Sequence, residues 1–145
     1  MPNFVKSVLI DAPVSVVFAF HEREDALSLL SPPFLKVRMA ARNCGIHTGA
    51  RVELRIAGFS WIARHTAYEK DALFVDEQVQ GPFAKWVHRH EFADLGGKTR
   101  LTDRLEYQLP GGWITNTLVG WVISTGLHFM FSYRHRVTRE FCERE

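Results

Sequence analysis

The sequence predicts one α+β domain in which a curved, seven-stranded antiparallel sheet wraps around a long C-terminal helix, with two short helices between the first and second strands. Short runs rich in Val, Ile and aromatic residues alternate with turn residues through the middle of the chain. A stretch without proline then runs from Trp113 to about Glu143, long enough for a helix of about 45 Å. Such a helix needs a large partner surface, which the sheet supplies.

The composition is that of a single globular domain covering residues 1–145. Hydrophobic residues make up 46% of the chain and charged residues 23%, and a chain of this length can bury a core of its own. The net charge is +2 and the basic residues form no long stripe, so we expect no nucleic acid as a partner. Cys44 and Cys142 are far apart and no secretory leader is visible, which favours reduced thiols and a cytoplasmic location.

The N-terminal part of the chain is predicted to contain one strand and two short helices. Residues 3–10 are rich in Val, Ile and Phe, as strands are. Pro13 suits the first turn of a helix, whose apolar face would carry Val14, Val17, Phe18 and His21. A second short helix is predicted over Glu24–Leu30, and it ends because prolines follow Ser31.

Six further strands are separated by glycine, proline and polar turns. They are predicted over 34–42, 51–56, 59–68, 73–79, 83–92 and 99–109. Turns such as Gly96-Gly97 are short, and short turns join antiparallel neighbours.

The strand over 83–92 separates two kinds of side chain. Successive residues of a strand point to opposite faces. One face therefore carries Trp86, His88, His90 and Phe92, and the other carries Lys85, Val87, Arg89 and Glu91. Large aromatic residues need burial, so the face with the two histidines is predicted to point inward.

The next strand carries an aspartate inward. Its apolar face consists of Leu101, Leu105, Tyr107 and Leu109 and includes Asp103. A buried carboxylate needs a partner, and we consider a histidine, a backbone donor or Arg38. His88, His90 and Asp103 form either an internal hydrogen-bonded network or a polar cluster that orients a ligand in an apolar pocket.

A His-x-His pair can also bind zinc, with Asp103 as a third ligand. This spacing is common and no fourth ligand is evident, so we predict no metal site. No glycine-rich loop precedes a helix and no nucleophile-elbow motif is present, so we also predict no cofactor.

Two further elements contribute to the predicted cavity. On the strand over 59–68, Trp61 and His65 share a face, and Trp61 favours the inward direction for both. On the long helix, residues at helical spacing form an apolar stripe of Leu118, Trp121, Val122, Thr125 and Phe129. A neighbouring stripe of the same helix is also apolar, and the residues of both stripes are expected to lie in the core.

The uncharged segment Trp113–Phe131 is too polar for a stable membrane insertion.

The ligand cavity is therefore predicted between the sheet and the C-terminal helix. Its walls are predicted to comprise Trp61, His65, Trp86, His88, His90, Phe92, Asp103, Leu105, Tyr107, Leu118, Trp121, Val122, Thr125 and Phe129.

Several motifs along the chain resemble one known superfamily. They are Ala12-Pro13 with Val17-Phe18, Gly81-Pro82-Phe83, Trp86-x-His88-x-His90-x-Phe92, Thr99-x-Leu101-x-Asp103-x-x-x-Tyr107-x-Leu109-Pro110 and Phe131-x-Tyr133-Arg134-His135-Arg136. Together they resemble a bacterial branch of the SRPBCC superfamily, the helix-grip group of START lipid-transfer domains, polyketide cyclases and birch-pollen-allergen-like proteins. The resemblance implies a cavity for lipids, polyketides or other hydrophobic molecules, and it implies no reaction and no catalytic residue.

Three functions are compatible with these predictions. The first is binding or carriage of a small hydrophobic molecule without catalysis. The second is a cyclase, aromatase or hydrolase-like enzyme that uses His88, His90 and Asp103 as acid and base. The third is an interaction module whose apolar helix docks a protein or a membrane surface, and a homodimer is left open as well.

Overall fold

The structure is a computed structural model that describes residues 3–32, 37–43, 46–56 and 59–144, with the backbone alone for 37–43, 56, 112–116 and 118. Its elements in chain order are β1 (Asn3–Ile10), α1 (Val14–Glu22), α2 (Ala26–Leu30), β2 (Val37–Asn43), β3 (Arg51–Ile56), β4 (Phe59–Glu69), β5 (Leu73–Gln80), β6 (Lys85–Asp94), β7 (Thr99–Gln108) and α3 (Gly112–Cys142).

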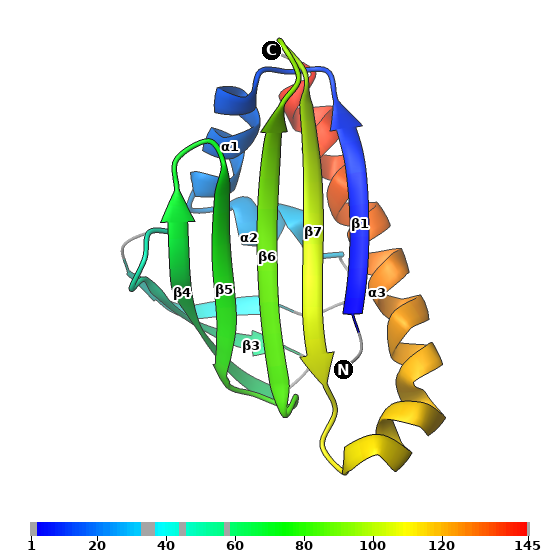
Figure 1. Ribbon diagram of the computed structural model, residues 1–145. Helices are drawn as coiled ribbons and strands as arrows, with labels where there is room; N and C mark the ends of the chain where they lie inside the picture. Colours follow the sequence, from blue (N-terminus) through cyan, green and yellow to red (C-terminus); the bar gives the residue numbers. More distant parts are fainter. Residues whose placement is uncertain (1–2, 33–36, 44–45, 57–58, 145) are drawn as a thin grey trace.

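The strands form one antiparallel sheet in the order β1-β7-β6-β5-β4-β3-β2. The first strand pairs with the last, with Phe4 opposite Leu105. The chain then crosses through α1 and α2 to the other edge of the sheet, where β2 pairs with β3. Figure 1 shows how the sheet curves from the long strands β1, β7 and β6 toward β3, so that it has a concave side.

The predicted α+β class, the antiparallel sheet and the long C-terminal helix are confirmed. Some boundaries differ from the prediction. The strand predicted from residue 83 begins at Lys85, because the side-chain amide of Gln78 bonds to both backbone groups of Phe83 and holds that residue in the turn. Helix α2 begins at Ala26 instead of Glu24. Residues 34–36 of the predicted strand lie outside the described residues.

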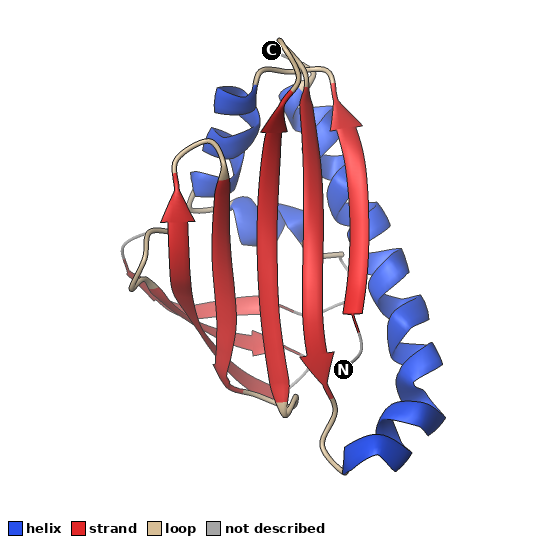
Figure 2. Ribbon diagram, in the orientation of Figure 1, coloured by secondary structure: helices blue, strands red, loops and turns tan. Residues whose placement is uncertain are grey.

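The helices lie together on one side of the sheet (Figure 2). Helix α3 contacts β1, α1 and α2, and it begins directly after Gly111, whose φ of 94° favours glycine. In the described part of the chain, no helix is long and apolar enough to cross a membrane.

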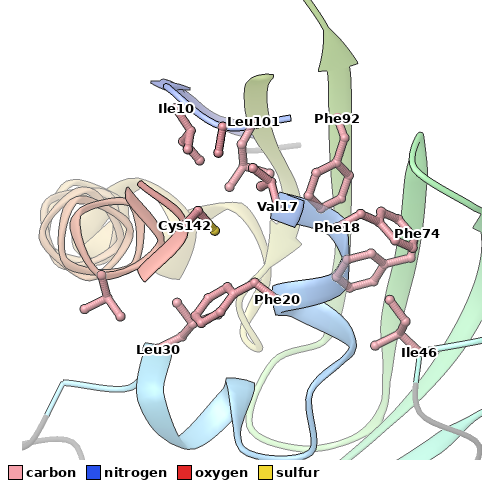
Figure 3. Packing of buried hydrophobic residues seen from close by; sticks show 12 residues of the cluster. Ile10, Val17, Phe18, Phe20, Leu30, Ile46, Phe74, Phe92, Leu101 and Cys142 are labelled. Atoms are coloured by element: carbon pink, nitrogen blue, oxygen red, sulfur yellow. The ribbon is translucent and has the colours of Figure 1, made fainter. Parts of the chain in front are cut away.

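The core consists of two hydrophobic clusters. The first gathers around Phe18 of α1, whose ring meets the edge of Phe92 at 5.0 Å between centroids, and it reaches Ile10, Leu101 and Cys142 (Figure 3). The second cluster lies toward the other end of the sheet and consists of Phe4, Trp86, Leu105, Tyr107, Leu127 and Phe131. The two clusters leave a space between them under the concave side of the sheet.

Candidate functional site: a cavity with a histidine and aspartate corner

A cavity of about 390 Å³ lies between the sheet and the helices. Its walls come from β3, β4, β5 and β6 on one side and from α1, α2 and α3 on the other. Most of the lining side chains are apolar, among them Leu54, Trp61, Trp86, Ile123 and Leu127. A cavity of this size and character suits a small organic molecule with limited polarity.

Three polar side chains of β5 and β6 meet at one wall of the cavity. Asp76 lies opposite His88 in the ladder between these strands, and Phe74 lies opposite His90. Because side chains alternate along a strand, Asp76, His88 and His90 all point to the concave side. We call these three residues the polar corner.

Asp103 lies behind the polar corner and holds it in place. It is opposite His90 in the ladder between β6 and β7, and it is 4% exposed. The Nε2 atom of His88 donates to Oδ1 of Asp103 at 2.8 Å. The Nε2 atom of His135, which comes from α3, donates to Oδ2 at 2.6 Å. The sheet and the C-terminal helix are therefore tied together by a buried carboxylate.

His90 lies between two carboxylates. Its Nε2 atom is 2.8 Å from Oδ2 of Asp76, and its Nδ1 atom is 3.2 Å from Oδ1 of Asp103. Burial works to lower the pKa of His90, but the hydrogen bonds to Asp103 and Asp76 outweigh burial and raise its pKa above 6.5. Both ring nitrogens can donate when the ring is protonated, so the geometry favours an imidazolium at this position.

The pKa of His88 is shifted in the opposite direction to that of His90, although the two rings stack at 3.7 Å between centroids. Burial and the neighbouring His90 lower the pKa of His88, and this outweighs the effect of Asp103. Its Nε2 atom donates to Asp103, which leaves Nδ1 with a lone pair, 4.0 Å from Oδ2 of Asp76. Two stacked histidines at the cavity wall thus have pKa values that are shifted in opposite directions.

The two aspartates are held as anions. Burial works to raise the pKa of Asp103, but hydrogen bonds from His135, His88 and His90 hold it well below 3.8. For Asp76, burial is likewise opposed by the hydrogen bond to His90 and by the charges of the nearby histidines, and its pKa falls to about 2. For both aspartates, the neighbouring histidines outweigh burial and favour the ionised form.

Four more titratable side chains line the cavity, and His21 and Arg134 are two of them. Burial lowers the pKa of His21 to about 4, although its Nδ1 atom donates to the carbonyl of Val17 at 2.9 Å. Burial also lowers the pKa of Arg134, against the attraction of Asp103 and Asp76. The Nε atom of Arg134 is buried without a hydrogen-bond partner among the described residues. Its guanidinium stacks over Phe131 at 5.4 Å.

The structure brings six of the predicted cavity residues to the cavity wall. They are Trp61, His65, Trp86, His88, His90 and Val122. Trp61 meets the edge of Trp86 at 5.1 Å between ring centroids, so the inward direction predicted for the strand with Trp61 and His65 is correct. Asp103 is buried behind the wall and is bonded to histidines, one of the three kinds of partner considered for it.

Three predicted cavity residues are buried in the core and do not line the cavity. Phe92 packs against Phe18 in the first cluster. Leu105 and Tyr107 belong to the second cluster. These three side chains point inward, as predicted, but they pack against other core residues and not against the cavity.

The stripe predicted on the C-terminal helix is largely wrong. Trp121 is 70% exposed and Phe129 is 60% exposed, and Thr125 is exposed as well. The inward stripe is the neighbouring one, with Ile123, Gly126, Leu127, Met130 and Phe131 at the cavity. The side chain of Leu118 lies outside the described residues.

Sequence reasoning missed four polar residues of the site, which are Asp76, His21, Arg134 and His135. Asp76 shares a strand face with Phe74, and this alternation could have located it. His21 was placed on the apolar face of its helix but not at the cavity. Arg134 and His135 belong to a run of three basic residues, a pattern that by itself is typical of a solvated helix end.

Comparisons with known proteins agree with this architecture. Residues 10–131 match the family described as "Polyketide cyclase / dehydrase and lipid transport". No curated protein matches the chain. Among solved structures, the Zhui aromatase/cyclase from Streptomyces sp. R1128 is similar with a TM-score of 0.74 and 13% identity, over 99% of this chain and 94% of that one.

Two further solved structures are similar. A START superfamily protein from Mycobacterium smegmatis has a TM-score of 0.69 and 18% identity, over 98% of this chain and 97% of that one. A nucleoside-diphosphate sugar epimerase from Corynebacterium glutamicum has a TM-score of 0.73 and 27% identity. This chain is covered to 94% by that match but spans 28% of the epimerase.

Proposed function

Because the chain belongs to the polyketide cyclase / dehydrase and lipid transport family of the SRPBCC superfamily, we propose that it binds one small, mainly hydrophobic molecule in the cavity between the sheet and α3. The cavity of about 390 Å³ carries this proposal. Its volume falls in the range typical of small-molecule sites, about 300–1,000 Å³. The apolar walls would hold the body of the ligand, and the polar corner would hold an oxygen atom of it.

The glycines of α3 allow a direct test of the cavity. Gly126 lines the cavity, and a Cβ atom added there meets nothing within 4 Å. A Gly126→Leu side chain is therefore expected to occupy space at the cavity wall without a clash. Gly120 lies on the same helix, does not line the cavity and has equally open surroundings. Gly120→Leu is therefore the matched control.

We expect anilinonaphthalene sulfonate, a fluorescent probe of apolar sites, to bind the wild-type chain and Gly120→Leu with the same affinity. Gly126→Leu should bind it at least about tenfold more weakly, a loss of about 1.4 kcal/mol. Both variants should unfold cooperatively, which circular dichroism would check. Equal titrations of the two variants would place the probe outside the cavity and contradict the proposal.

The opposite pKa shifts of His88 and His90 favour a second candidate function, acid and base catalysis on the bound molecule. His88 would accept a proton at Nδ1, and the hydrogen-bonded pair of His90 and Asp76 would supply one, since groups with separated pKa values can take the two roles. Asp103 would position both rings and would not touch the substrate.

Mass spectrometry of the bound molecule before and after incubation would test the catalytic function. His88→Gln should abolish any chemical change while probe binding persists. His65→Gln, which also alters a cavity histidine, should preserve the change. If wild-type protein returns the molecule unaltered, binding without catalysis is the better description.

A further inference from the structure

The polar corner has the composition of a metal site. Asp76, His88 and His90 each offer a ligand atom, and these atoms lie within 4.8 Å of one another. Two imidazoles and one carboxylate are the donors of many sites for first-row divalent metals. The three residues come from adjacent strands of a rigid sheet, which fixes their spacing.

The orientation of the rings selects the ligand atoms. Nε2 of His88 and Nδ1 of His90 face Asp103 at 2.8 and 3.2 Å. The opposite atoms of the two rings therefore face the third residue. Oδ2 of Asp76 is 2.8 Å from Nε2 of His90 and 4.0 Å from Nδ1 of His88. An ion among these three atoms needs small side-chain shifts to reach bond lengths of about 2.0–2.2 Å.

Asp103 supplies the outer support that metal-binding histidines usually have. A ligating histidine commonly donates its second ring nitrogen to a carboxylate, which fixes the ring and raises its basicity. One oxygen of Asp103 serves both rings, and its other oxygen is held by His135 at 2.6 Å. The two histidine ligands come from β6, Asp103 comes from β7, and His135 comes from α3.

We propose that Asp76, His88 and His90 bind a divalent first-row transition metal such as Zn²⁺, with an open coordination position toward the cavity. This differs from the zinc site considered from sequence, because Asp103 supports the rings and Asp76 takes its place as the third ligand. Three protein ligands leave a position for water or for an oxygen of the cavity ligand, as in sites that act on a substrate. The metal site does not depend on the identity of the cavity ligand.

The charges of the site are consistent with this proposal. Asp76 and Asp103 place two carboxylates near one guanidinium, that of Arg134, which lines the cavity with Asp76. A dication that displaces the proton of His90 from Nε2 leaves both histidines neutral and gives the site one net positive charge. An anionic oxygen on the open position would remove that charge, and the same oxygen could face Arg134, which lines the cavity.

The test is a titration of purified full-length chain, stripped with a chelator, with Zn²⁺ followed by calorimetry and with Co²⁺ followed by visible absorption. Asp76→Asn keeps the shape of the side chain and removes its charge. His128→Gln removes an exposed histidine of α3 and is the matched control. Probe fluorescence of the same samples reports the state of the cavity separately.

We expect one ion per wild-type chain, with the Co²⁺ spectrum of nitrogen and oxygen ligands. Asp76→Asn should bind at least about tenfold more weakly, and Asp103→Asn should weaken binding by about 10- to 100-fold. His128→Gln should match the wild type. Absence of saturable binding by the folded wild type, or equal affinity in Asp76→Asn and His128→Gln, would overturn the metal site while leaving the cavity proposal standing.

Discussion

Asp103 is a charged residue in the interior whose cost of burial is offset by three histidines. His88 and His135 donate to its two oxygens, and His90 approaches the first of them at 3.2 Å. Burial of an unpaired carboxylate is expensive, whereas a carboxylate with good donors is tolerated. Removal of Asp103 therefore leaves three buried rings without their acceptor.

Asp103→Ala is expected to lower the free energy of unfolding by about 3–5 kcal/mol, because a buried charge network loses its centre. Urea unfolding followed by circular dichroism would measure this. Asp11→Ala removes an exposed aspartate and should change the stability by less than about 0.5 kcal/mol. Similar stability of the two variants would mean that the network contributes little to folding.

His21 gives the stability a defined dependence on pH. Its pKa is about 4 in the folded chain and 6.5 in the unfolded chain, so the unfolded chain binds more protons between these values. Stability therefore falls as pH drops from 6.5 to about 4, by about 3 kcal/mol from this residue. His21→Phe keeps the ring packing and removes the titration.

Urea unfolding of the wild type and His21→Phe at several pH values would separate this contribution. The stability difference between the two proteins should be constant above pH 6.5 and should change by about 3 kcal/mol toward pH 4. Other groups titrate in both proteins and cancel in the comparison. A constant difference over the whole range would contradict the burial of neutral His21.

At the scale of the elements, strands were easier to predict than the long helix. On β6 and β7 large apolar residues on one face alternate with mostly polar residues on the other, so His88, His90 and Asp103 could be assigned to the buried face. Helix α3 has two apolar stripes in its first half, and hydrophobicity there does not determine which one faces inward. The stripe that helical spacing predicted to line the cavity contains Trp121 and Phe129, which are exposed.

The second half of α3 contains the information that identifies the inward face. Its buried residues are Leu127, Phe131, His135, Val137, Thr138 and Cys142, and all but Val137 are spaced by three or four positions. Exposed charged residues such as Arg136, Arg139 and Glu140 lie between them. Extending this spacing backward leads to Ile123 and not to Trp121. The partners of Asp103, by contrast, depend on contacts between distant elements, which one sequence does not reveal.

Two phenylalanines of α3 provide a test of the helix orientation. Phe131 is 0% exposed and Phe129 is 60% exposed. Phe131→Ala is therefore expected to cost about 3–5 kcal/mol of stability. Phe129→Ala should cost less than about 1 kcal/mol. Thermal and urea unfolding would measure both, and a larger loss for Phe129→Ala would reverse the orientation assigned here.

At the scale of the whole molecule, the sheet and helices enclose a space that neither could form alone. The order of elements was predictable from the sequence, because turn residues and periodicity mark each one. The exact lining was not, since it depends on how α2 and α3 close over β3 to β6. The exposed Trp121 and Phe129 leave a docking role for α3 and a homodimer as open predictions, which light scattering would test.

Native mass spectrometry tests most directly whether the cavity is occupied. Wild type, Gly126→Leu and Gly120→Leu would be purified side by side from the protein's own host. We expect one small molecule per chain on the wild type and on Gly120→Leu, lost on denaturation and absent from Gly126→Leu. A bare chain mass for the wild type, or the same bound molecule on both variants, would contradict this expectation.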